Sequence, residues 1–127
     1  AKYEQMAREE IKYEAYNFDG AYRLLIVSYG TMSRVCRTAV DMLKDEGLEI
    51  AMLRPKYLFP FPSGPIRDAA GKDSCRAVLS VEMSMGQMVE DVERSVAGKS
   101  PVHWYGKCGG DVPTPEEVIE TVKKLVD

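Results

Sequence analysis

Cysteine and histidine are scarce in this sequence, which has three cysteines and one histidine among 127 residues. Cys36, Cys75 and Cys108 are odd in number and widely spaced, which excludes a disulfide framework and the CxxC pattern of a zinc or iron-sulfur site. For His103, a hydrogen-bonded structural role is predicted rather than a catalytic one. The scarcity of these residues therefore favours a metal-free domain without a nucleophile triad.

Long apolar runs and basic strips are also missing. No apolar run reaches the roughly 20 residues that span a bilayer, and residues 1–10 lack the apolar centre of a signal peptide. The 17 Lys and Arg against 20 Asp and Glu give a net charge of -3. We therefore expect a cytoplasmic protein that binds neither membrane nor nucleic acid. Because the sequence opens at Ala1 with a charged segment, we also expect a fragment of a longer chain.

The composition and length are those of one globular domain, with 45% hydrophobic and 29% charged residues. Nearly continuous apolar segments predict strands that are buried on both faces. These predicted strands are Ala21–Tyr29, Leu48–Leu53, Cys75–Val81 and the short Pro101–Tyr105.

Segments with helical periodicity alternate with the strands. The predicted helices are Lys2–Lys12, Thr31–Glu46, a segment from Gly86 to Val96, and a last helix capped by Thr114. Prolines exclude regular structure from Arg54 to Pro65, although Ile66–Ala70 has room for one helical turn. Alternating strands and helices predict a three-layer α/β/α sandwich around a mostly parallel sheet.

Two segments follow predicted strands and lead into helices, which is where open parallel sheets bind ligands. They contribute the candidate crevice residues Ser28, Tyr29, Gly30, Thr31, Glu82, Gly86 and Gln87. Neither segment has a GxGxxG or P-loop pattern. Plain turn chemistry with a protein contact is favoured over a phosphate or cofactor site. The carboxylate Glu82 is predicted to be a charge at a helix N-terminus rather than a general acid or base.

The cysteines differ in their predicted surroundings. Cys36 and Cys75 lie on predicted core faces and are interpreted as small buried hydrophobes. Cys108 follows Lys107 in a predicted glycine-containing loop. For this residue, an accessible and reactive thiol stays open as an alternative to a buried one.

An apolar loop is the most unusual feature of the predicted surface. A rigid loop of aromatic residues and prolines loses little entropy on binding, and methionines adapt to irregular partners. The interface interpretation is slightly favoured over burial in the domain's own core. The candidate docking surface comprises Phe59, Pro60, Phe61, Pro62, Met83 and Met85.

Four motifs in register resemble one family. They are Val27–Thr31, Leu53–Pro55 with Phe59–Pro62, Val81–Met88 and Pro113–Glu117. Together they are similar to the C-terminal domain of the α subunit of 2-oxoacid:ferredoxin oxidoreductases, closest to the 2-oxoisovalerate and 2-oxoglutarate branch. Ser84 stands where the family usually has Asn. The resemblance implies a transketolase C-terminal-domain fold over residues 20–127, preceded by a linker helix and edge strand in residues 1–19.

That fold has a five-stranded sheet with one antiparallel edge strand, which the resemblance places at Tyr13–Phe18. It implies that the whole enzyme uses thiamine diphosphate, Mg²⁺, coenzyme A and iron-sulfur clusters to make acyl-CoA from a 2-oxoacid and reduce ferredoxin. No motif for these cofactors occurs here, so no catalytic, cofactor-binding or metal residue is assigned. The implied role is assembly, with the thiamine-binding domains and neighbouring subunits as partners.

Two alternatives stay open. Within enzymes, the chain is the matching domain of a transketolase or of a 2-oxoacid dehydrogenase β chain. Outside enzymes, it is a free-standing ligand-binding or regulatory α/β domain.

Overall fold

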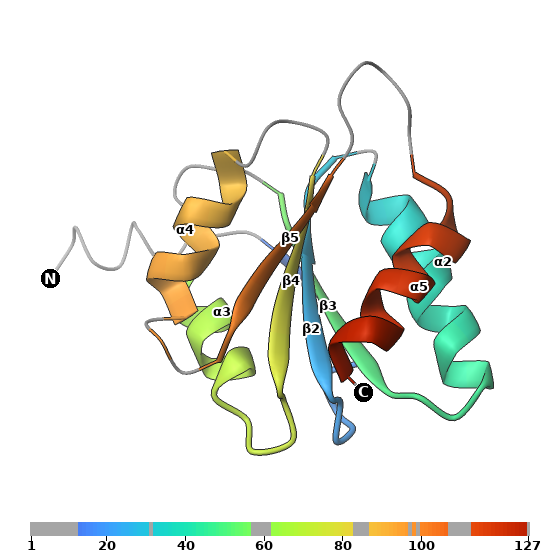
Figure 1. Ribbon diagram of the computed structural model, residues 1–127. Coiled ribbons are helices and arrows are strands. Elements are labelled where there is room, and N and C mark those ends of the chain that lie inside the picture. Colours follow the sequence, from blue (N-terminus) through green and yellow to red (C-terminus); the bar gives the residue numbers. More distant parts are fainter. Residues whose placement is uncertain are drawn as a thin grey trace, which may run out of the picture.

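The computed structural model describes residues 13–30, 32–56, 62–82, 87–96, 98, 100–106 and 113–126. Strands and helices alternate along these residues (Figure 1). In chain order they are β1 (Tyr13–Tyr16), β2 (Leu24–Ser28), α2 (Met32–Asp45), β3 (Ile50–Pro55), α3 (Ser63–Ala70), β4 (Ala77–Glu82), α4 (Gln87–Val96), β5 (Val102–Gly106) and α5 (Pro115–Val126). The predicted helix Lys2–Lys12 lies outside the described residues.

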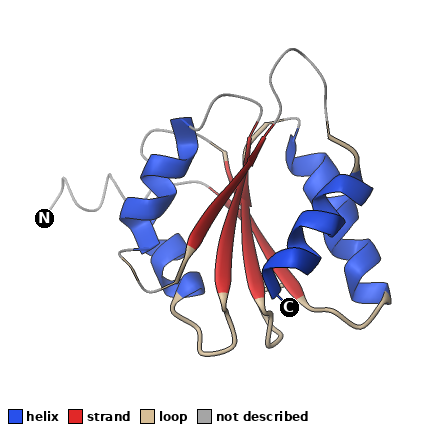
Figure 2. Ribbon diagram, in the orientation of Figure 1, coloured by secondary structure: helices blue, strands red, loops and turns tan. Residues whose placement is uncertain are grey.

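The strands form one sheet in the order β1-β3-β2-β4-β5. Strands β3, β2, β4 and β5 are parallel to their neighbours, and β1 pairs antiparallel with β3. Helices α3 and α4 cover one face while α2 and α5 cover the other (Figures 1 and 2). The predicted three-layer sandwich with one antiparallel edge strand is therefore confirmed.

The core has two halves because successive side chains of a strand point to opposite faces. On β2, Leu24 and Ile26 pack in the half that contains the apolar residues of α2 and α5. Leu25 and Val27 pack in the half that contains those of α3 and α4. All four side chains have no exposed surface. The chain thus buries both faces of its central strand with its own helices.

The edge strand β1 has the position that the family resemblance implied. Its Tyr13 pairs with Pro55 and its Tyr16 with Met52. The strand ends earlier than expected because Asn17 has a φ of 62°, a left-handed conformation that asparagine tolerates. The Asn17 Nδ2 donates to the Ile50 carbonyl oxygen at 2.9 Å, which fixes the turn against β3.

The expectation of irregular backbone from Arg54 to Pro65 was wrong at both ends. Strand β3 continues through Pro55, where β1 pairs with it at the edge of the sheet. Helix α3 begins at Ser63 and includes Pro65. A proline is tolerated in the first turn because the N–H groups there have no partner within the helix.

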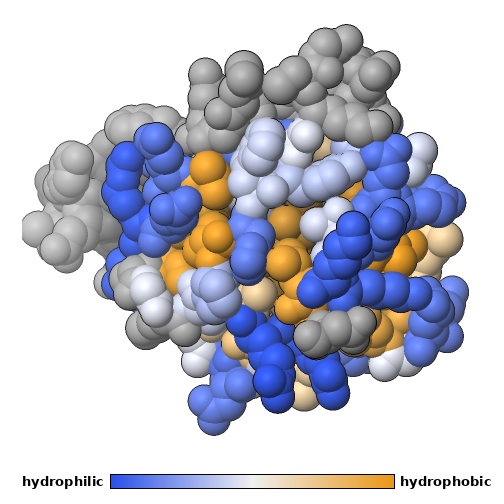
Figure 3. Space-filling model, viewed as in Figure 1, coloured by the Kyte–Doolittle hydropathy of each residue, from blue (hydrophilic) through white to orange (hydrophobic). Residues whose placement is uncertain are grey.

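The surface agrees with this layered core. In the view of Figure 3, hydrophilic residues cover the outer sides of the helices, and hydrophobic residues show on both sides of β5. Among the described residues, none of the helices has the length and apolar character needed to cross a membrane.

Gly106 is required where β5 ends. A Cβ at this position would lie 2.3 Å from the Glu82 carbonyl oxygen of β4 and 2.7 Å from a ring carbon of Trp104. We expect Gly106→Ala to lower the free energy of unfolding by about 1–3 kcal/mol, because overpacking forces the paired strands apart. Thermal and denaturant unfolding measure the change.

Gly64→Ala is the matched control for this substitution. A Cβ at Gly64, in helix α3, would contact nothing within 4 Å, and its φ is not positive. Alanine also favours a helix over glycine, so stability should stay equal or rise slightly. Equal melting temperatures for Gly106→Ala and the parent chain would contradict the close approach of β5 to β4.

Candidate functional site

The predicted crevice lies where the strand order reverses. From β2 the chain passes to β3 on one side, and it then crosses to β4 on the other side. Ser28 at the end of β2 pairs with Val81, the residue before Glu82 at the end of β4. Ser28 and Glu82 therefore lie on adjacent strands at the switch point of the sheet.

The predicted crevice residues differ in their surroundings. Ser28 is buried, whereas the side chain of Tyr29 is 40% exposed. Gly30 has a φ of 69°, and its carbonyl oxygen accepts hydrogen bonds from the Ser33 N–H and hydroxyl, at 3.1 and 2.6 Å. Thr31 and Gly86 lie outside the described residues, and Gln87 is described only as the first residue of α4.

The Glu82 carboxylate binds the N-terminus of helix α4. Its Oε1 accepts from the Met88 N–H at 2.9 Å and its Oε2 from the Val89 N–H at 3.0 Å. The Ser80 hydroxyl donates to Oε2 at 3.3 Å. The residue is only 5% exposed. A negative charge is favourable there because the helix dipole is positive at its N-terminus.

This arrangement confirms the prediction of a helix-terminal charge at Glu82. Both carboxylate oxygens accept from main-chain N–H groups, which hold the side chain in one orientation. The carboxylate joins the end of β4 to the first turn of α4 across residues 83–86. The side chain thus occupies the acceptor position at the start of α4.

The two described cysteines lie on opposite faces of the sheet. Cys36 packs in the half of the core under α2, and Cys75 packs in the half under α3 and α4. Burial raises the pKa of the Cys36 thiol to about 12, although a contact with the Ser28 hydroxyl lowers it in part. Burial also raises the pKa of the Cys75 thiol. The prediction that both are buried is confirmed, while Cys108 lies outside the described residues.

Metal ligands do not gather in the part of the chain that the structure describes. No group of three or more His, Cys, Asp or Glu side chains there could hold a metal ion. The described cysteines are separated by the sheet and cannot share a cluster. Cofactor-free status of the whole chain stays a prediction.

His103 was expected to have a hydrogen-bonded structural role, and the structure differs from that expectation. The residue is exposed on the edge strand β5, and the described residues contribute no hydrogen bond to its ring. Its neighbour Tyr105 has the tertiary contact instead, because its hydroxyl donates to Glu117 Oε2 at 2.7 Å. Burial and the Glu117 carboxylate raise the pKa of Tyr105 to about 12.

The predicted cap of the last helix is confirmed. The Glu117 N–H donates to the Thr114 hydroxyl at 3.2 Å, and Pro115 occupies the first position of α5. The Tyr105 contact connects this capped end to β5.

The predicted docking surface falls mainly on residues that the structure does not describe. Phe59, Pro60, Phe61, Met83 and Met85 lie outside the described residues. Pro62 is described, and it is buried immediately before α3, where its carbonyl oxygen accepts from the Ile66 N–H at 3.2 Å. Strand β3 ends before one of these segments and β4 before the other. Because both strands are parallel to β2, their last residues lie at the same carboxyl-terminal end of the sheet. The docking surface itself stays a prediction.

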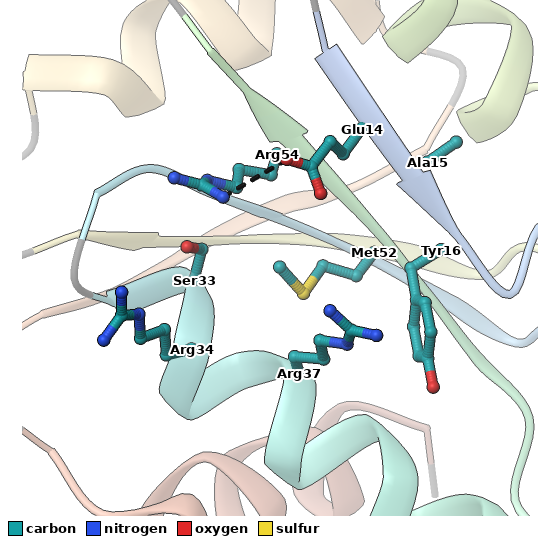
Figure 4. Close-up of a pocket in the computed structure, with 8 residues that line it drawn as sticks. All are labelled: Glu14, Ala15, Tyr16, Ser33, Arg34, Arg37, Met52 and Arg54. Atoms are coloured by element: carbon teal, nitrogen blue, oxygen red, sulfur yellow. Dashed lines mark hydrogen bonds and ion pairs between the residues drawn. The ribbon is translucent and has the colours of Figure 1, made fainter.

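Two cavities involve residues that the sequence did not single out. One, of about 350 Å³, lies beside α3, where Lys72 Nζ donates to the Phe18 and Gly20 carbonyl oxygens at 2.9 and 3.1 Å. The other, of about 240 Å³, lies between α2 and the β1–β3 edge of the sheet (Figure 4). It is lined by Glu14, Ala15, Tyr16, Ser33, Arg34, Arg37, Met52 and Arg54. In the sequence, the feature that could have indicated this second cavity is the pair Arg34 and Arg37, three residues apart on one helix.

The chain matches a known protein family. The model of pyruvate:ferredoxin oxidoreductase core domain II matches residues 23–118. The chain is 40% identical over 124 residues to the ketoisovalerate oxidoreductase subunit VorB of Methanothermobacter thermautotrophicus, covering 98% of this chain and 34% of that protein. It is 34% identical over 118 residues to the 2-oxoglutarate synthase subunit KorA of the same organism, covering 93% and 29%. The chain thus spans about a third of the length of these relatives.

Solved structures show the same fold. A 2-oxoglutarate:ferredoxin oxidoreductase from Magnetococcus marinus, with 2-oxoglutarate, coenzyme A and succinyl-CoA bound, superimposes with a TM-score of 0.79 at 24% identity. The match covers 99% of this chain and 22% of that one. A split-gene transketolase, an inactive β4 tetramer, matches with a TM-score of 0.69 at 19% identity, covering 89% and 41%.

The anchoring role of Glu82 predicts the effect of Glu82→Gln. An amide offers one accepting oxygen, and its NH₂ group would face a main-chain N–H. We expect a loss of about 1–3 kcal/mol in the free energy of unfolding, measured by denaturant titration. The control is Glu90→Gln on α4, whose ion pair with Arg94 is 75% exposed on both sides and should contribute at most about 0.5 kcal/mol. Equal losses for both variants would contradict the anchor.

Burial of the thiols predicts their reactivity. In the Cys108→Ser variant, Cys36 and Cys75 should not react with a disulfide reagent at pH 8, and both should react after unfolding in guanidinium. Since the pKa of Cys36 in the folded chain lies above the ordinary thiol value of 9.0, the stability from its burial is complete below pH 9. It declines as the pH rises toward about 12. Rapid labelling of either thiol in the native chain would contradict the burial.

Proposed function

This chain belongs to the family of pyruvate:ferredoxin oxidoreductase core domain II, and from that membership we propose that it is a non-catalytic assembly domain of a 2-oxoacid:ferredoxin oxidoreductase α subunit. The complete enzyme would convert a 2-oxoacid to an acyl-CoA and pass electrons to ferredoxin. The relatives named for ketoisovalerate and 2-oxoglutarate support a branched-chain or dicarboxylic 2-oxoacid as substrate.

The hydrogen bonds from the start of α4 to the Glu82 carboxylate are the observation that supports a non-catalytic role. At the switch point, where an enzyme of this sheet type would bind its ligand, the buried carboxylate accepts from two N–H groups of α4. The thiols described are buried with raised pKa values, so neither is a ready nucleophile. At the crevice, the Glu82 carboxylate is thus used to bind the start of α4.

The cofactors of the complete enzyme would be held by other parts of it. Thiamine diphosphate and its Mg²⁺ need a diphosphate-binding loop, and iron-sulfur clusters need several thiolates. The described residues do not fit these groups, because they contain no set of three possible metal ligands and their two cysteines lie on opposite faces. No step of the reaction is therefore assigned to this chain.

The partners would be the thiamine-binding domains and neighbouring subunits of the same enzyme. The contact would be formed by Phe59, Pro60, Phe61, Met83 and Met85, whereas Pro62 is buried within the domain. The last residues of β3 and β4 lie at the same carboxyl-terminal end of the sheet, so both segments begin on the same side of the domain. An aromatic anchor beside methionines suits a docking surface because it joins a rigid group to adaptable ones.

A turnover assay tests the absence of catalysis. The chain alone is supplied with thiamine diphosphate, Mg²⁺, coenzyme A, an electron-accepting dye and a panel of branched and dicarboxylic 2-oxoacids. We expect no dye reduction above background, whereas the complete oxidoreductase reduces the dye under the same conditions. Turnover by the chain alone would refute the proposal.

Phe61→Asp tests the docking role. Exposed aromatic surface loses about 1.5–3 kcal/mol of favourable burial unless a partner covers it. The substitution should leave the thermal unfolding of this chain unchanged and abolish co-purification of the full-length α subunit with its partner. Met42→Asp, at a side chain that is 38% exposed on α2, is the control and should leave assembly intact. A strongly destabilised Phe61→Asp chain would mean that Phe61 is core, and normal assembly would mean that it contacts nothing.

A further inference from the structure

Three arginines surround the cavity of about 240 Å³ between α2 and the sheet edge. Arg34 and Arg37 come from the first turns of α2, and Arg54 comes from the end of β3 (Figure 4). One carboxylate, Glu14, lines the same space. This arginine pocket, made of Arg34, Arg37 and Arg54, is strongly positive in a chain whose net charge is -3.

Neighbouring side chains hold two of these arginines in place. Arg54 Nη1 lies 3.3 Å from Glu14 Oε1. The two residues are direct partners in the pairing of β3 with β1. The Arg37 guanidinium lies over the Tyr16 ring, 4.9 Å from its centroid. The Tyr16 hydroxyl in turn donates to Asp41 on α2. These contacts restrict the side chains of Arg37 and Arg54, which lowers the entropy cost of binding at these two positions.

Unused hydrogen-bonding capacity remains in the pocket. Arg54 Nε is buried and has no hydrogen-bond partner among the described residues. The Arg34 side chain likewise has no ion pair within the part of the chain that the structure describes. The first turn of α2 contains no acidic residue, so its dipole adds to the positive potential. The exposed Arg34 side chain and the exposed part of the Arg54 side chain can therefore donate to an anionic ligand.

We propose that the arginine pocket binds a small organic dianion, either a dicarboxylate or a phosphomonoester. The lining residues carry three guanidinium groups and one carboxylate, a formal excess of two positive charges, which the Asp41 carboxylate at the Tyr16 hydroxyl reduces. Arginine forks bind carboxylates and phosphates with paired hydrogen bonds. The volume lies just below the range of about 300–1,000 Å³ for common ligand sites, which favours a small molecule. Ala15, Tyr16 and Met52 supply apolar surface for its carbon atoms.

This site is separate from the switch point at Ser28 and Glu82. Its lining comes from α2 and the β1–β3 edge, and none of its residues touches the Glu82 anchor in the interactions described. Ligand binding would therefore be independent of the assembly role and of catalysis elsewhere in the enzyme.

Titration calorimetry of the 127-residue chain with malonate and with inorganic phosphate at pH 8 tests the proposal. Ionic strength is held constant with NaCl, and acetate serves as the monoanion control. We expect saturable binding of at least one dianion at one site per chain, with acetate at least about tenfold weaker. Absence of saturable binding of both dianions would overturn the proposal.

Variants assign the binding to the pocket. Arg34→Gln should weaken binding about tenfold, which is the size expected for one lost charge-assisted hydrogen bond, without changing the melting temperature of the free chain. Arg54→Lys keeps the charge and loses the fork, so it should weaken binding by a smaller factor. The matched control is Arg23→Gln, an exposed arginine before β2 at the opposite end of the sheet. An equal loss for Arg23→Gln would mean non-specific attraction and would overturn the proposal.

The same titration on the assembled oxidoreductase tests whether the pocket stays open to a free anion. Binding that persists in the assembly supports a free small molecule as the ligand. Binding that is present in the chain and lost in the assembly would overturn that assignment, because the pocket would then be covered by a neighbouring part of the enzyme.

Discussion

The central strand β2 must be buried on both faces, and most of the structure depends on that constraint. Its side chains Leu24 to Val27 have no exposed surface, and each contributes about 1.5–3 kcal/mol only if a helix covers it. The chain therefore places α2 and α5 on one face and α3 and α4 on the other. To do so it crosses β2 once, between β3 and β4, and this crossing creates the switch point.

The switch point brings strand ends and a helix start together in a buried place. The N–H groups at the start of α4 need acceptors there, and the Glu82 carboxylate supplies them. In many sheets of this kind the same groups bind a ligand. Here the Glu82 side chain of the domain itself takes that position.

Local sequence signals predicted the buried elements and the edge strand β5, but they did not predict the other edge strand, β1. Continuous apolar runs located β2 and β4, and the Thr114 cap located α5. Strand β1 has no such signal, because Tyr13, Glu14 and Ala15 are all exposed, and only family resemblance placed it. Pro55 and Pro65 were misleading because their consequences depend on which N–H groups the fold leaves without partners. The arginine pocket was missed because Arg54 reaches Arg34 and Arg37 only through the packing of α2 against β3.

The central claim is that this domain contributes assembly rather than chemistry. The most direct test is a sedimentation measurement on an α subunit that is truncated to lack this domain and mixed with its partner subunits. The measurement is made without this chain and again with this chain added as a separate molecule. The account predicts that the truncated subunit alone fails to reach the mass of the complete enzyme, and that added chain restores that mass. Full assembly of the truncated subunit without the chain would contradict the account.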